Sequence, residues 1–244
     1  ACGDKEEPKQ PEEQPVEEQQ VAVDVKQQAE SFKEYAQAQM DDFVADTERL
    51  ARLVKEGKLE DAQKLYPLVT MYYERLQPLT ANFTELDKKI NGPLIDGKEE
   101  EITGFHRLAQ GLFINKNTSG YDVVVDQLVA DVKQLQQDFE SLDVSQTNVL
   151  ASAVSMFDQM VNERLTTTSN ANNEVYAVKA QTEVAEELVK IFMQRVSTES
   201  AATATEKIAA LNEVVAYYEV GKEDYVNYSF FTAKQKEELK TAVV

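Results

Sequence analysis

Apolar side chains recur every three or four residues along almost the whole chain, and this spacing constrains the fold more than any other feature. No stretch alternates strictly between apolar and polar residues, so little β-structure is expected. Only 8 of the 244 residues are Gly and 6 are Pro, and no Pro follows Pro93, which leaves the rest of the chain free to form long helices. The first predicted helix, from Val23 to Lys55, has its apolar face at Ala29, Phe32, Ala36, Met40, Phe43, Leu50 and Val54.

Further helices are predicted along the chain. One runs from Leu59 to Leu76, with a kink or break at Pro67, and Pro78 either ends that run or begins a new turn. Residues 84 to 100 contain two strong turn signals and are predicted to be irregular. A short helix is predicted to start at Thr232. Four apolar stripes predict the remaining helices, and they lie at Val124, Leu128, Val132, Leu135 and Phe139; at Leu150, Ala153, Phe157, Met160 and Val161; at Val175, Val178, Ala185, Leu188, Phe192 and Val196; and at Ile208, Leu211, Val215 and Tyr218.

Long helices joined by short loops pack as antiparallel bundles. The predicted fold is therefore all-α, with antiparallel helical bundles arranged as two four-helix units that share one core.

The first residues, Ala1-Cys2-Gly3-Asp4, resemble the processing site of a bacterial lipoprotein, in which the Cys thiol carries the lipid. Cys2 is the only Cys, so a disulfide within the chain is excluded. Between Gly3 and Gln20 there are three Pro, six Glu and four Gln, a composition typical of disorder. Residues 1–21 are therefore predicted to be a lipid attachment site and a disordered acidic tether, and residues 22–244 the folded domain. An accidental Cys is the alternative.

The charge balance and the missing motifs exclude several functions. The chain has 25 Lys and Arg against 44 Asp and Glu, a net charge of −19. Such a field repels nucleic acid and attracts cations or basic partners. There is no run of 18 apolar residues, and hence no predicted transmembrane helix. The chain has no glycine-rich phosphate loop and no second His to pair with the single one in a catalytic or zinc motif. It is therefore not expected to be an enzyme.

Three segments resemble the imelysin-like family, and specifically its EfeO-type iron-uptake lipoproteins, over most of residues 30 to 220. They are residues 58–78, which end in Met71-Tyr72-Tyr73-Glu74-Arg75-Leu76-Gln77-Pro78; residues 83–91; and Gly104-Phe105-His106-Arg107. The resemblance implies an all-α imelysin-like domain in residues 22–244 with a metal site between helices. It also implies a lipid anchor on the extracytoplasmic face of a bacterial cell membrane, and a role in iron transport with a membrane iron permease as partner.

The residues at the family's metal-ligand positions are partly different in this chain. By resemblance, Glu74 and His106 are the candidate metal ligands, and Gln77, Asn91 and Glu174 are candidate pocket residues. The family has acids where this chain has Gln77 and Asn91. An amide oxygen is a weaker ligand than a carboxylate, so weak metal binding or none is expected.

The family's His-x-x-Glu pair is also incomplete, because Ala109 follows His106 at the position of the Glu. A spacing of three places two ligands on one helix face, and Ala cannot ligate. Two hypotheses follow. The protein either binds a metal or an iron complex for delivery to a membrane partner, with acids such as Glu99-Glu100-Glu101 as replacement ligands, or it is a metal-free ligand- or protein-binding module. Peptidase activity is a distant third, since the Glu that would act as base or ligand is missing. A buried His106 that only hydrogen-bonds a neighbour such as Glu74 is the structural alternative.

Overall fold

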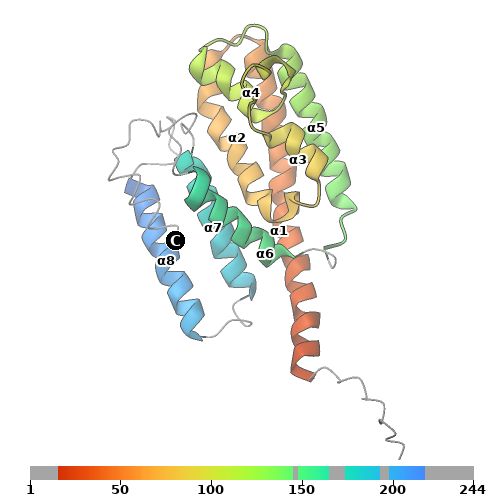
Figure 1. Cartoon of the computed structure of the whole chain (residues 1–244), viewed down its shortest axis with the longest axis vertical. Helices are drawn as coiled ribbons and strands as arrows, with labels where there is room; N and C mark the ends of the chain where they lie inside the picture. Colours follow the sequence, from red (N-terminus) through yellow and green to blue (C-terminus); the bar gives the residue numbers. More distant parts are fainter. Residues whose placement is uncertain (1–15, 145–147, 165–173, 193–197, 218–244) are drawn as a thin grey trace, which may run out of the picture.

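The computed structural model describes residues 16–144, 148–164, 174–192 and 198–217, and within these ranges every long element is a helix (Figure 1). The predicted all-α class is confirmed. Three short turns interrupt the helices, a 3-10 turn at Glu99–Glu101 and π-helical turns at Gln110–Ile114 and Met160–Arg164. The helices are α1 (Val16–Lys55), α2 (Leu59–Thr80), α3 (Thr84–Asn91), α4 (Phe105–Ala109), α5 (Asp122–Glu140), α6 (Val149–Gln159), α7 (Glu174–Phe192) and α8 (Thr198–Tyr217).

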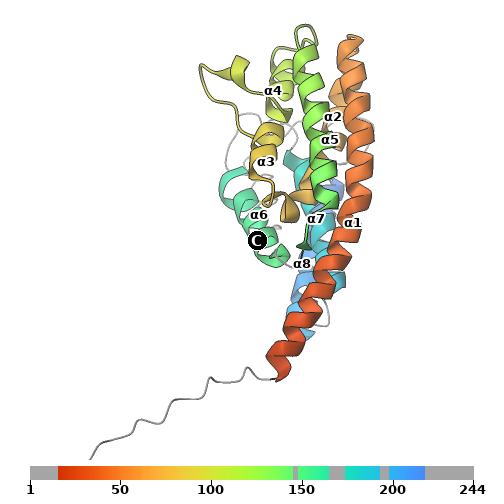
Figure 2. The same ribbon diagram turned by 90° about the vertical axis from the view of Figure 1, so that its right-hand side faces the viewer.

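The helices form two units that share a core. Figures 1 and 2 show α1, α2 and α5 side by side, with the short α3 and α4 against them, and α6, α7 and α8 grouped nearer the N-terminal end of α1. Helix α2 packs against α1 and also against α6 and α7, so it belongs to both units. One continuous cluster of buried apolar side chains includes residues of α1, α2, α5, α6 and α7. This confirms the prediction of bundled helices around a shared core.

Helix α1 begins earlier than predicted. All seven residues of its predicted apolar face are buried, but the helix starts at Val16 rather than Val23. Residues 16–21 are thus helical and not part of a disordered tether. The reason is local, because Pro15 is the last Pro before the helix and Glu and Gln favour helix. The rest of the tether, with Cys2, lies outside the described residues.

Helix α2 continues through both of its Pro residues, where a kink or break at Pro67 and an end or a new turn at Pro78 were expected. It runs to Thr80, and 12 of its 22 residues are buried. The Thr70 hydroxyl donates a hydrogen bond to the Pro67 carbonyl at 3.0 Å, and the Thr80 hydroxyl donates to the Gln77 carbonyl at 3.3 Å. Packing on α1, α6 and α7 offsets the cost of the Pro residues, which local propensity alone would have placed at a helix boundary.

The segment expected to be irregular contains helix α3. Acidic residues lie in its first turn and basic residues in its last turn, which suits the helix dipole. Gly104, just before α4, then meets the end of α3. Its φ is +90°, and a Cβ there would lie 2.3 Å from the Lys89 carbonyl oxygen and 2.5 Å from that of Ile90. Only Gly therefore allows α4 to start this close to α3.

The buried face of α6 is shifted from the predicted one. Val149, Ala153, Met156 and Met160 are buried, whereas Leu150 is 42% exposed. This helix is apolar on more than one face, so periodicity could not choose the buried one. Of the other stripes, the described side chains of α5 and α7 point to the core except at half-buried Val124 and Ala185, and the side chain of Val175 lies outside what the structure describes. The predicted helix at Thr232, together with Val196 and Tyr218, lies outside the described residues.

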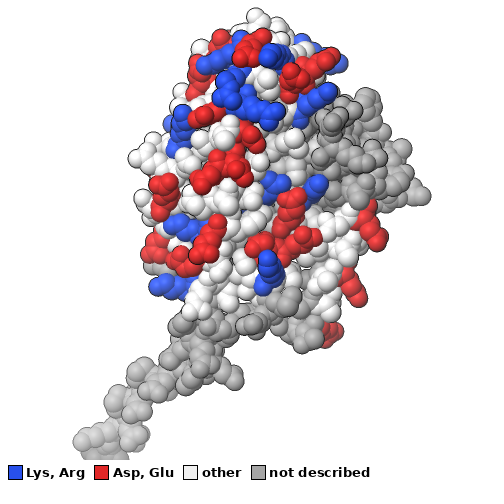
Figure 3. Space-filling view, turned by 180° about the vertical axis from the view of Figure 1, so that it is seen from behind, with Lys and Arg blue, Asp and Glu red and all other residues white. Residues whose placement is uncertain are grey.

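Charge is unevenly distributed over the surface. Residues 49–116 contain 11 Lys and Arg and 10 Asp and Glu, whereas the rest of the chain contains 14 and 34. Figure 3 shows Lys and Arg gathering at the upper end of the molecule, the end farther from the start of α1. The negative excess therefore lies outside the segment from the end of α1 to the start of α5.

Candidate functional site

Glu74 is a buried carboxylate at the contact between the two units. It lies on α2 and is 6% exposed. Gln181 on α7, which is 2% exposed, donates a hydrogen bond from Nε2 to Glu74 Oε2 at 3.3 Å. Such a bond offsets part of the cost of removing a carboxylate from water. The other amide atom, Gln181 Oε1, is buried and has no hydrogen-bond partner among the described residues.

A second hydrogen-bonded pair, of which Tyr73 is buried and Asp87 half-buried, lies one residue away. Tyr73 is 2% exposed and its hydroxyl donates a hydrogen bond to Asp87 Oδ1 on α3. Burial raises the pKa of Tyr73 well above its ordinary value of 10.0, and the Asp87 charge raises it further. Burial also raises the pKa of Asp87 above 3.8; the Tyr73 hydrogen bond opposes this shift, while the charge of Glu74 adds to it. Tyr73, Glu74 and Asp87 therefore form one electrostatically coupled group between α2 and α3.

A cavity opens beside this group, between α2, α3 and α6. Its volume is about 370 Å³, and Asp87 is the only charged residue among the described residues that line it. The wall otherwise consists of hydroxyls, side-chain amides, two Ala and one Met. The lining residues are Gln77, Thr80, Ala81, Asp87, Ala151, Ser152, Ser155, Met156 and Gln159.

His106 and Asn91 flank the place where the backbone at Gly104 meets the end of α3. His106 is the second residue of α4 and is half-buried; Asn91 is the last residue of α3 and is also half-buried. The neighbour of His106, Phe105, lies 5.9 Å from Phe43, ring to ring, and Phe43 lies 5.8 Å from Tyr73. These aromatic contacts connect the start of α4 to the part of α2 that carries Glu74.

The predicted site residues are thus only partly brought together. Gln77 lines the cavity, whereas His106 and Asn91 are not in its wall. Glu174 is the first residue of α7, but its side chain is outside what the structure describes.

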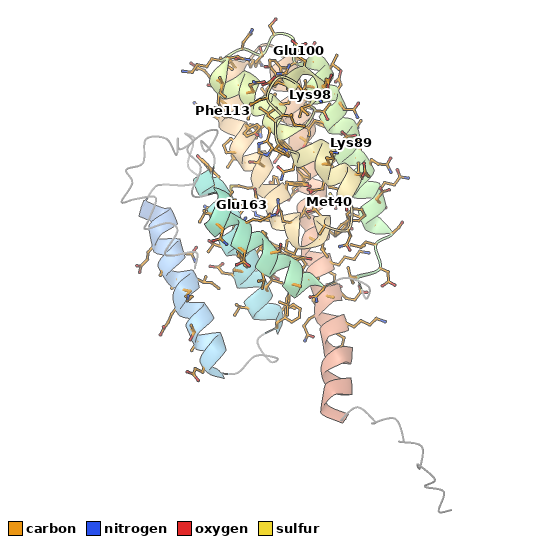
Figure 4. The ribbon with its side chains drawn as sticks, in the orientation of Figure 1. Met40, Lys89, Lys98, Glu100, Phe113 and Glu163 are labelled. Carbon is orange, nitrogen blue, oxygen red and sulfur yellow. The ribbon has the colours of Figure 1, made fainter. Side chains whose placement is uncertain are left out.

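Within the described ranges, no three His, Cys, Asp or Glu side chains gather as a metal site would require. Metal ligation by Glu74 and His106 therefore stays a prediction. The acidic turn Glu99–Glu101, considered as a source of replacement ligands, lies in the loop between α3 and α4 and is mostly exposed. Figure 4 shows Glu100 at the top of the molecule, well away from Glu163 in the π-helical turn that follows α6. None of these three acids lines the cavity.

Sequence reasoning missed Tyr73, Asp87 and Gln181 as site residues. A signal existed for Asp87, because it lies four residues before Asn91 and so shares its face of α3. On α6, the spacing of Ser152, Ser155 and Gln159 also places three polar residues on one helix face. Gln181 gave no such signal, since its contact with Glu74 spans 107 residues.

The fold and the site define a protein whose described residues form helices, with a buried carboxylate and a polar cavity where two helical units meet. Residues 28–216 match the family model for Imelysin, and the chain belongs to this family. No helix among the described residues has the length and apolar character needed to span a membrane.

Similar proteins from staphylococci are named lipoproteins. The chain is 28% identical over 222 residues to an Efem/EfeO family lipoprotein of Staphylococcus haemolyticus (strain JCSC1435), covering 87% of this chain and 77% of that protein. It is 29% identical over 181 residues to an Efem/EfeO family lipoprotein of Staphylococcus aureus (strain NCTC 8325 / PS 47), covering 70% of this chain and 63% of that protein. The chain thus spans less than two thirds of the second relative.

Proposed function

We propose that this protein is a lipid-anchored lipoprotein on the extracytoplasmic face of a bacterial membrane. In this proposal it binds a metal ion or an iron complex as cargo. It then delivers the cargo to a membrane partner such as an iron permease. The anchor is supported by the names of the relatives and by the position of Cys2 after Ala1. The role is one of binding and delivery, and no catalytic step is part of it.

The observation that carries the cargo proposal is the burial of Glu74. An ionised carboxylate at 6% exposure costs free energy unless its partners offset that cost, and Gln181 donates one such hydrogen bond at 3.3 Å. A bound cation would offset the cost further. His106 is the proposed second ligand, and Gln77 and Asn91 would contribute only amide oxygens, which favours modest affinity.

Calorimetric titration of the 244-residue chain tests this proposal. Ferric citrate, Cu²⁺ and Zn²⁺ are titrated separately into the parent and into the Glu74→Gln and His106→Ala variants. Saturable binding of one of them, weakened at least about tenfold in both variants, is expected, since a charged ligand contributes roughly 1.5–3 kcal/mol. The control is Glu85→Gln, which removes an exposed acid from α3 and should bind as the parent does. A parent that binds none of the three contradicts the proposal.

A metal-free binding module is the second candidate, and one observation favours it. The side chain that reaches Glu74 from α7 is an amide, and the cavity wall beside it is made mostly of amides and hydroxyls. Such groups suit a hydrogen-bonding ligand better than a hard metal ion. A crystal soaked in ferric citrate that shows iron at Glu74 and His106 would exclude this alternative.

A further inference from the structure

The cavity between α2, α3 and α6 lies beside the proposed metal ligands Glu74 and His106 and shares Gln77 with that site. Neither Glu74 nor His106 is among its described lining residues, and its α6 wall comes from a part of the chain that none of the three family segments includes. We propose that this cavity is a second binding site, and that its ligand is a small organic cation, an ammonium group on a carbon skeleton that also carries hydroxyl groups. This inference does not depend on metal binding at Glu74.

The charge of the ligand follows from Asp87. Among the described residues of the wall it is the only charged one, and the Tyr73 hydroxyl donates a hydrogen bond to its Oδ1. A carboxylate has a second oxygen, which is the acceptor that a ligand in the cavity would use. Burial and the nearby charge of Glu74 both disfavour the ionised form of Asp87. A cation in the cavity would stabilise that ionised form, so the surroundings favour a positively charged ligand.

The remaining wall indicates an organic ligand rather than a metal ion. A hard metal ion needs several anionic oxygens, and here there is one carboxylate. An ammonium group needs neutral acceptors as well, and Gln77, Ser155 and Gln159 are within the same wall. Hydroxyl groups on the ligand can pair with the remaining amide and hydroxyl groups.

The volume of the cavity and the apolar part of its wall determine which carbon skeleton the ligand can have. Ala81, Ala151 and Met156 provide methyl and thioether surface against which carbon atoms can pack. A volume of about 370 Å³ lies at the lower end of the range for small-molecule sites, which is roughly 300–1,000 Å³. The net charge of −19 would also raise the concentration of cations near the protein.

Titration of the full chain with glucosamine tests the inference, with sorbitol as an uncharged polyol and methylammonium as an amine without hydroxyls. We expect saturable binding of glucosamine that is clearly tighter than that of either analogue. Asp87→Asn should weaken it at least about tenfold, because a hydrogen bond to a charged group contributes roughly 1.5–3 kcal/mol. The Asn side chain still offers an oxygen to the Tyr73 hydroxyl, so the fold should be retained. Asp96→Asn, which removes an exposed acid from the following loop, is the matched control and should not change affinity.

A second variant fills the cavity from the other side. Ser155→Leu on α6 adds volume to the wall without touching Asp87's charge, and it should also reduce glucosamine binding by at least about tenfold. Absence of glucosamine binding overturns the inference, as does sorbitol binding of equal strength that Asp87→Asn leaves unchanged. Because the metal titration uses Glu74→Gln and His106→Ala, a failure here leaves the metal proposal standing, and the reverse also holds.

Discussion

Gly104→Ala is expected to destabilise the protein strongly, because two separate costs fall on this one residue. Gly104 has φ +90° and ψ −170°, a region that is essentially limited to Gly, and holding another residue there costs roughly 1–3 kcal/mol. The new Cβ would also lie 2.3 Å from the Lys89 carbonyl oxygen and 2.5 Å from that of Ile90. Relieving that overlap moves the start of α4 away from α3 and costs roughly 1–3 kcal/mol more. The total is about 4 kcal/mol, out of a typical stability of about 5–15 kcal/mol.

Urea denaturation followed by circular dichroism measures this cost, and Gly97→Ala separates its two parts. Gly97 also has a positive φ, +78°, but nothing lies within 4 Å of its added Cβ. Only the backbone cost of roughly 1–2 kcal/mol then applies. With a denaturant dependence of about 2–3 kcal/mol per molar urea, the midpoint should fall by about 1.5 M for Gly104→Ala and about 0.5 M for Gly97→Ala. Equal shifts in the two variants would refute the close approach of α4 to α3.

Three further perturbations test the core, the buried hydroxyl and the contact between the units. Phe43→Ala, at a side chain that is 0% exposed, should cost about 3–5 kcal/mol in urea denaturation, and a cost below about 1 kcal/mol would contradict its central position. Above pH 10.0 the Tyr73 hydroxyl keeps its proton in the folded state, whereas the unfolded chain loses it. The free energy of unfolding should therefore fall as the pH rises beyond that value, by up to about 1.4 kcal/mol per pH unit. Tyr73→Phe should make that fall less steep, and an unchanged slope would argue against a buried phenol. Arg75→Met removes the 2.6 Å hydrogen bond from Arg75 Nε to Glu183 Oε2, which joins α2 to α7. It should lower the free energy of unfolding by about 1–2 kcal/mol, and equal stability of variant and parent would show that solvent already screens the pair.

Much of the fold could be predicted because helix α1 has one clear apolar face. Its residues from Ala29 to Val54 recur at helical spacing, and all seven predicted positions are buried. The same reasoning could not choose between a kink and a break at Pro67; a break is wrong, because α2 continues through Pro67 and packs among three other helices. It was also wrong on α6, where Leu150 and Val149 are equally apolar and only the fold decides which is buried.

Less of the candidate site could be predicted, since its partners are distant in sequence. The resemblance to a family identified Glu74 and Gln77, and the structure places the first in the buried contact between units and the second in the cavity wall. The bond between Glu74 and Gln181 depends on how α7 docks on α2, which no local pattern determines. Tyr73 belongs to a family segment, but its contact with Asp87 is visible only in the structure, where α3 places Asp87 against its hydroxyl.

The position of α2 between the two units has a consequence for the rates at which parts of the molecule open. Its backbone amides can exchange with solvent only when α1 on one side and α6 and α7 on the other have separated from it, so α2 should be among the slowest segments in hydrogen exchange. Helix α8, which packs mainly on α7 and is largely exposed along its described face, can open without disturbing the core. Glu74 is therefore carried by the segment that moves least, and any movement that uncovers it would have to come from α6 and α7.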